Sequence, residues 1–85
     1  MRDLTQEQQF ILAFDQSFRR AIENPENIAP NGAIDWDFVD ADVYMDMCKA
    51  FGSLQKNTIL HDLYYEELDQ SISDQIECEA YGHII

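Results

Sequence analysis

The chain has 85 residues, of which 46% are hydrophobic, 12% are aromatic and 26% are charged. Seventeen Asp and Glu residues against five Lys and Arg give a formal net charge of −12. This composition is too apolar for a disordered chain, and the length suits one hydrophobic core. The charge disfavours direct binding to nucleic acid or to an anionic membrane surface and favours a basic partner. We therefore expect residues 1–85 to form a single acidic domain.

The first predicted helix begins at Gln6 and ends near Ile22 or Asn24. Thr5 and Gln8 match a capping box, in which each side chain accepts a hydrogen bond from the backbone N–H of the other residue. Apolar residues then recur at helical spacing on one face: Phe10, Phe14, Phe18 and Ala21, with Ile11 and Ile22 beside them. This face is expected to enter the core.

Residues 24–33, with the sequence NPENIAPNGA, hold both prolines and one of the three glycines of the chain. Such a composition is typical of a loop. The segment has no glycine-rich phosphate-binding pattern. It is therefore predicted to be a connector between two helices.

The second predicted helix begins after Asp35, which serves as its N-cap. Ile34 and Val39 then occupy the two positions of a hydrophobic staple, and Gly52 is available for a left-handed cap at the other end. The predicted core face consists of Trp36, Val39, Val43, Met47, Ala50 and Phe51.

An alternative for the same region makes residues 33–39 extended and starts the helix at Asp40. It depends on the alternation of Ile34, Trp36 and Phe38 with acidic residues, which is the pattern of a half-buried strand. The chain would then be α+β with a short extended segment.

The third predicted helix begins between Ser53 and Thr58 and reaches about Ala80. Apolar residues repeat every four positions and form one stripe: Leu60, Tyr64, Leu68, Ile72 and Ile76. The tail after Gly82 is expected to pack its two isoleucines on the domain or to fray. The sequence as a whole predicts an all-α, small three-helix domain.

Acidic residues are concentrated in two segments, from Ala21 to Cys48 and from Asn57 to Ile85, each with seven acids and no Lys or Arg. In the second segment, acids at positions i, i+4, i+7 and i+15 project to one side of the predicted helix: Asp62, Glu66, Asp69 and Glu77. A row of carboxylates on a rigid helix resembles the regular charges along a nucleic-acid backbone. Tyr65 and Tyr81, beside these acids, are expected to be exposed anchors for a partner.

Metal binding and catalysis are not indicated. The run from Asp35 to Asp46 has aspartates at positions 1, 3 and 12 of a calcium-type loop, but Asp40 stands at position 6, where that loop needs glycine. The cysteines and histidines lack zinc-site spacing: Cys48, Cys78, His61 and His83. Both cysteines are predicted to be small packing groups, and we expect no metal, no cofactor and no enzymatic activity.

The preferred interpretation is a non-enzymatic inhibitor that binds a basic nucleic-acid-binding protein through a DNA-mimic-like carboxylate surface, as an anti-defence protein of a phage or other mobile element. The predicted partner-binding residues are Asp35, Asp42, Asp46, Asp62, Glu66, Asp69, Glu77 and Tyr65. The alternative is an acidic interaction module, such as an antitoxin, adaptor or small regulatory subunit, that uses an apolar face. The sequence does not decide whether the chain forms a homodimer. The absence of a long apolar run predicts a cytoplasmic protein without membrane contact.

Overall fold

The computed structural model describes the backbone of residues 4–82 and the side chains of residues 4–78. Across this range the chain is all-α, with helices α1 (Gln6–Glu23), α2 (Trp36–Phe51) and α3 (Thr58–Gly82) and short 3-10 helices η1 (Pro25–Asn27) and η2 (Leu54–Lys56). The only strand-like pairing in the described backbone is an isolated bridge between Ile28 and Ile34. The predicted three-helix fold is confirmed.

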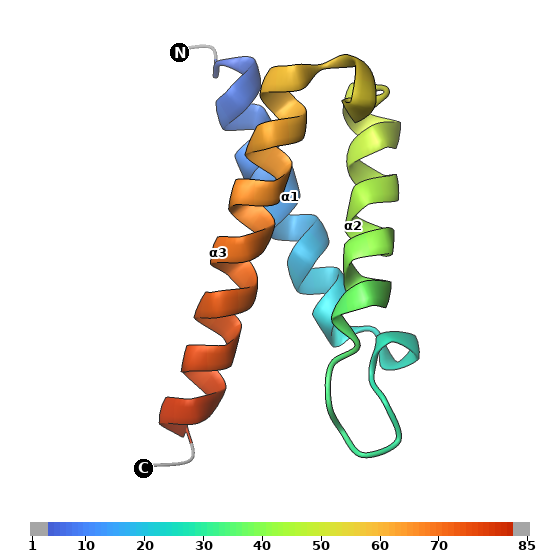
Figure 1. Ribbon diagram of the computed structural model, residues 1–85, viewed down its shortest axis with the longest axis vertical. Helices are drawn as coiled ribbons and strands as arrows, with labels where there is room; N and C mark the ends of the chain where they lie inside the picture. Colours follow the sequence, from blue (N-terminus) through green and yellow to red (C-terminus); the bar gives the residue numbers. More distant parts are fainter. Residues whose placement is uncertain (1–3, 83–85) are drawn as a thin grey trace.

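The three helices are arranged around α1. In Figure 1, α1 slants across the molecule from the start of α3 to the start of α2, and it contacts both helices. The connection through η2 turns the chain from the end of α2 into α3. Helix α1 therefore supplies the surface on which the other two pack. None of the described helices combines the length and apolar character needed to cross a lipid bilayer.

The beginning of α1 follows from a capping box, as predicted. The Gln8 backbone N–H donates to Thr5 Oγ1 at 3.1 Å, and the Thr5 backbone N–H donates to Gln8 Oε1 at 3.0 Å. The helix ends at Glu23, where Asn24 is the cap and Pro25 follows. Proline disfavours helical geometry at the preceding residue, so α1 cannot continue into the loop.

Asp35 is the N-cap of α2, and its carboxylate accepts hydrogen bonds from the backbone N–H groups of Asp37 at 3.2 Å and Phe38 at 3.4 Å. The alternative extended segment over residues 33–39 is therefore wrong from Trp36 onward, because N-capping fixes the helical start. At the other end, Gly52 has a φ of 85°, a conformation that glycine adopts without steric cost.

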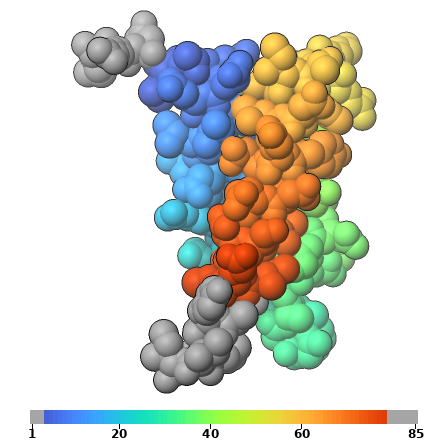
Figure 2. All heavy atoms as spheres, turned by 60° about the vertical axis from the view of Figure 1, so that its left-hand side comes forward, coloured from blue at the N-terminus to red at the C-terminus, as the bar shows by residue number. Residues whose placement is uncertain are grey.

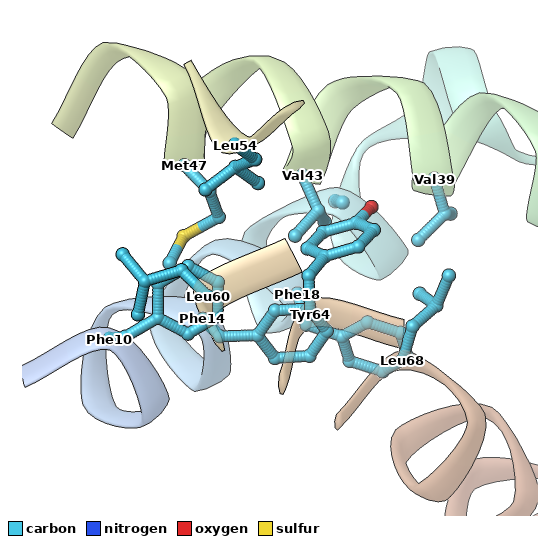
Figure 3. Close-up of a cluster of buried hydrophobic side chains, with 11 residues drawn as sticks. Phe10, Phe14, Phe18, Val39, Val43, Met47, Leu54, Leu60, Tyr64 and Leu68 are labelled. Carbon is cyan, nitrogen blue, oxygen red and sulfur yellow. The ribbon is translucent and has the colours of Figure 1, made fainter. Parts of the chain in front are cut away.

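The core lies between the three helices and is completed by η2. Figure 3 shows the phenylalanines of α1 facing Val39, Val43 and Met47 of α2 and Tyr64 of α3. The buried hydrophobic residues are Phe10, Phe14, Phe18, Ala21, Val39, Val43, Met47, Leu54, Leu60, Tyr64 and Leu68. This set confirms the predicted phenylalanines of α1 and half of the predicted face of α2, and Trp36 and Phe51 of that face are partly buried against the same core.

Three residues that were assigned to core faces are exposed. Ile76 has 51% of its surface exposed, Ile11 has 37%, and Ala50 is also exposed. Four residues turn a helix by roughly 40° more than one full circle, so a stripe with four-residue spacing winds around the helix. Along α3, exposure accordingly rises from buried Leu68 through half-buried Ile72 to exposed Ile76. On α2, Phe51 is half-buried and packs against the core, whereas Ala50 lies on the exposed side of the helix.

Candidate partner-binding surface

The acidic row of α3 consists of Asp62, Glu66, Asp69 and Glu77, and all four side chains are exposed. At about 100° per residue they fall within about 80° of one another around the helix axis. Figure 2 shows α3 running along the front of the molecule, with α1 on one side and the α2 region on the other. The four carboxylates therefore lie on one exposed side of α3, where approaching molecules can reach them.

No cation of the described side chains pairs with this row. The two ion pairs in that part of the chain both use arginines of α1: Arg19 with Asp15 at 3.3 Å, and Arg20 with Asp46 at 3.9 Å. The α3 carboxylates thus keep their charge available to a partner, and their mutual repulsion costs about 0.2 to 0.5 kcal/mol per close pair.

Asp42 and Asp46, two more of the predicted partner-binding residues, accept hydrogen bonds from side chains of α1 and η1. Asn27 donates to Asp42 at 2.8 Å and also to the Ala21 carbonyl at 2.9 Å, and Ser17 donates to Asp46 at 2.8 Å. Ser17 and Asn27 are only 2% and 4% exposed. The two aspartates therefore fasten α2 to α1 and η1.

The same two aspartates line a hollow of about 320 Å³ between α1 and α2, together with Arg20 and Lys49. None of the α3 carboxylates lines this hollow. The structure therefore does not bring the eight predicted residues into one site: it separates Asp42 and Asp46 from the acidic row of α3, and it uses Asp35 as a helix cap.

The capping role of Asp35 leads to a stability prediction. Replacing Asp35 with alanine removes the acceptor for two backbone N–H groups at the start of α2. We expect the free energy of unfolding to fall by about 1 kcal/mol, whereas serine, a comparable N-cap, should restore most of it. Urea unfolding followed by circular dichroism measures both changes. Equal losses for alanine and serine would contradict the capping role.

Between α2 and α3 lies a second hollow, of about 410 Å³, which we call the α2–α3 groove. Its lining includes Asp37, Asp40, Tyr44, Met45, His61 and Tyr65. Met45 is 56% exposed and Tyr65 is 45% exposed. The exposure of Tyr65 agrees with its predicted role as an anchor, while Tyr81 lies outside the residues whose side chains are described, as do the terminal isoleucines.

Sequence reasoning missed the α2 side of this groove. Phe38, Ala41 and Met45 are spaced i, i+3 and i+7, which is a second apolar stripe opposite the core face of α2. All three are exposed. The spacing was the available signal, and it was obscured because the same segment also carries four aspartates between Asp37 and Asp46.

Aromatic rings connect the groove to the core. Tyr64 makes edge contacts with Tyr44 at 5.1 Å and with Tyr65 at 5.2 Å between ring centroids, and His61 contacts Tyr65 at 5.0 Å. The Tyr64 hydroxyl donates to the carboxylate of Asp40. Burial, followed by this hydrogen bond, raises the pKa of Tyr64 above its ordinary value of 10.0. Tyr64 therefore stays protonated and holds Asp40 at the groove.

The described side chains contain no cluster of three or more His, Cys, Asp or Glu residues placed to hold a metal ion. Cys48 is half-buried, but Cys78 is exposed, so its predicted packing role is wrong. Cys78 follows the part of α3 where the apolar stripe has already turned away from the core. Comparison with protein-family models, with curated proteins and with solved structures gave no match for this chain.

Proposed function

We propose that this protein is a non-enzymatic inhibitor that occupies the nucleic-acid-binding groove of a basic protein with the acidic row of α3. The observation that carries the proposal is the presentation of four exposed carboxylates on one helical face, with no ion pair to them among the described side chains. An anti-defence role in a phage or other mobile element fits this mode of action.

The geometry of α3 supports the proposal. At about 1.5 Å of rise per residue, the row from Asp62 to Glu77 extends over about 22 Å. A groove lined with Lys and Arg attracts regularly spaced negative charges, whether phosphates or carboxylates, and long-range attraction speeds the encounter. A helix holds its charges in fixed positions, so less conformational entropy is lost on binding than for a flexible acidic tail.

A second candidate function is an acidic adaptor or regulatory subunit that binds through apolar contacts. The observation in its favour is the exposure of Phe38, Met45 and Tyr65, at 56%, 56% and 45%. Large exposed apolar side chains close together are typical of protein interaction sites. For this candidate, binding would depend little on salt and on the α3 carboxylates.

Charge reversal on α3 tests the proposal. The variant carries three substitutions, Asp62→Lys, Glu66→Lys and Asp69→Lys, and we expect it to bind the target at least about a hundredfold more weakly, because attractive pairs become repulsive. A matched control reverses three exposed acids outside α3: Glu7→Lys, Glu23→Lys and Glu26→Lys. Both variants change the net charge equally, so only a role for the α3 face separates them.

The measurement is affinity capture on the immobilised protein at low and high salt, with identification of the retained proteins and competition by duplex DNA and by RNA. We expect the retained proteins to be nucleic-acid-binding proteins that added nucleic acid displaces. Retention that persists at high salt, resists nucleic acid and tolerates the reversals on α3 would contradict mimicry and support the adaptor.

A further inference from the structure

The α2–α3 groove combines apolar anchoring surface with acidic edges. Met45 and Tyr65 expose about half of their surface at its walls, and Phe38 is exposed on the adjoining face of α2. Asp37 and Asp40 line the same groove, and no Lys or Arg is among its described lining residues. Aromatic and Met side chains are enriched at protein interfaces, and Met in particular adapts to different partner shapes.

The groove is continuous with the acidic row of α3. Tyr65 follows Asp62 by three residues and precedes Asp69 by four, so both carboxylates flank its ring on the helix surface. Asp62 and Asp69 do not line the groove themselves but are helical neighbours of Tyr65 on its α3 side, whereas Asp37 lines its α2 side. An occupant that fills the groove must have an apolar face between two positively charged flanks.

We propose that the α2–α3 groove binds an amphipathic basic helix of the partner protein, with the helix placing apolar side chains on Met45 and Tyr65 and directing Lys or Arg toward Asp37, Asp62 and Asp69. The inference rests on the proposed function in one respect, since it identifies which part of the basic target makes contact. It adds an apolar anchor that a pure mimic of nucleic acid would not need.

A helix suits the site better than an extended strand. The described backbone has no β-strand and so offers no free sheet edge for strand addition. Two neighbouring helices form a groove into which the ridge of a third can pack. From Asp37 to Met45 the groove wall extends over about 12 Å, which matches about two turns of a bound helix. Arginine on such a helix also stacks well on a tyrosine ring.

Two synthetic peptides of about 14 residues, roughly four helical turns, test the occupant. The first has lysine on one helical face and leucine on the other, and the second replaces each leucine with alanine at the same charge. Binding of the fluorescein-labelled peptides to the full chain is followed by fluorescence anisotropy at several salt concentrations. We expect the leucine peptide to bind at least about tenfold more tightly than the alanine peptide, because only leucine fills the groove.

Variants of the chain locate the binding site. We expect Met45→Ser and Tyr65→Ser each to weaken binding of the leucine peptide by about tenfold, as for anchors at the centre of an interface. Leu12→Ser and Ile76→Ser are matched controls, because these side chains are 54% and 51% exposed but do not line the groove. Circular dichroism and thermal unfolding of all four variants verify that the helices are retained.

The outcomes separate this inference from the proposed function. Equal binding of the two peptides, or equal losses for groove and control variants, would overturn the groove proposal while leaving competition with nucleic acid unaffected. Groove-dependent binding of the leucine peptide supports the inference even if no nucleic-acid-binding protein is displaced in the capture experiment. The groove proposal would also be overturned if the α3 reversal variant lost binding of the leucine peptide while Met45→Ser and Tyr65→Ser kept it, because charge alone would then account for the contact.

Discussion

Replacing Phe14 with alanine is expected to destabilise the fold by about 3 to 5 kcal/mol, the usual cost of removing a buried aromatic side chain. Phe14 is 1% exposed, and its ring lies 5.6 Å from Tyr64 and 6.0 Å from Phe18 between centroids. A domain of this length has a total stability of roughly 4 to 13 kcal/mol, so the loss is a large fraction of it. Urea unfolding followed by circular dichroism measures the change.

Phe38→Ala is the matched control, since it makes the same chemical change at a residue that is 56% exposed. Its cost is expected to stay within about 0.5 kcal/mol, as for most surface substitutions. If both variants lost the same stability, Phe14 would not occupy the centre of the core that Figure 3 shows.

The second large effect is expected at Tyr64, which joins the core to Asp40. Its hydroxyl donates to the Asp40 carboxylate and also lies 2.9 Å from the Asp40 backbone carbonyl. Replacement with phenylalanine keeps the ring and removes the hydroxyl, and we expect a loss of about 1.5 to 3 kcal/mol, as for a hydrogen bond to a charged group. The free energy of unfolding at neutral pH measures this loss. Tyr65→Phe is the control, because no hydrogen bond of the Tyr65 hydroxyl is found among the described side chains.

Tyr64 also makes the stability of the fold depend on pH in the alkaline range. The pKa of Tyr64 is raised in the folded protein above the ordinary value of 10.0, so the folded state keeps a proton that the unfolded chain releases. The contribution to stability is complete below pH 10.0 and is lost as the pH rises toward the folded pKa. We expect the wild-type chain to lose stability above this pH more steeply than Tyr64→Phe. Parallel pH profiles of the two proteins would contradict this account.

Local signals in the sequence predicted the starts of the helices well. The capping box of Thr5 and Gln8 and the N-cap at Asp35 involve residues at most three positions apart, so their geometry depends little on the rest of the fold. Apolar spacing identified the buried phenylalanines of α1 and the buried Val39, Val43 and Met47 of α2 for the same reason, but it wrongly placed Ile11 and Ala50 on these faces. On α3, the spacing failed to predict the exposure of Ile76, because a stripe with four-residue spacing winds gradually around the helix and away from the core.

The candidate site was only partly predictable. The α3 row follows from helical spacing alone, which is why Asp62, Glu66 and Asp69 lie together as expected. The hydrogen-bond donors to Asp42 and Asp46 are 15 and 29 residues away in sequence, and no sequence pattern predicts these contacts. The α2–α3 groove depends on how two helices pack, so its lining emerges only from tertiary structure.

The central position of α1 also affects how the chain folds during synthesis. Helix α1 is synthesised before α2 and α3, yet its buried phenylalanines share one core with side chains as far along the sequence as Leu68. An isolated helix of this length is marginally stable in water, so its apolar face stays accessible while the later helices are made. A nascent chain that stops before α3 would therefore expose this face to chaperones and to other nascent chains. The core shared by α1, α2 and α3 can close only after α3 has been synthesised.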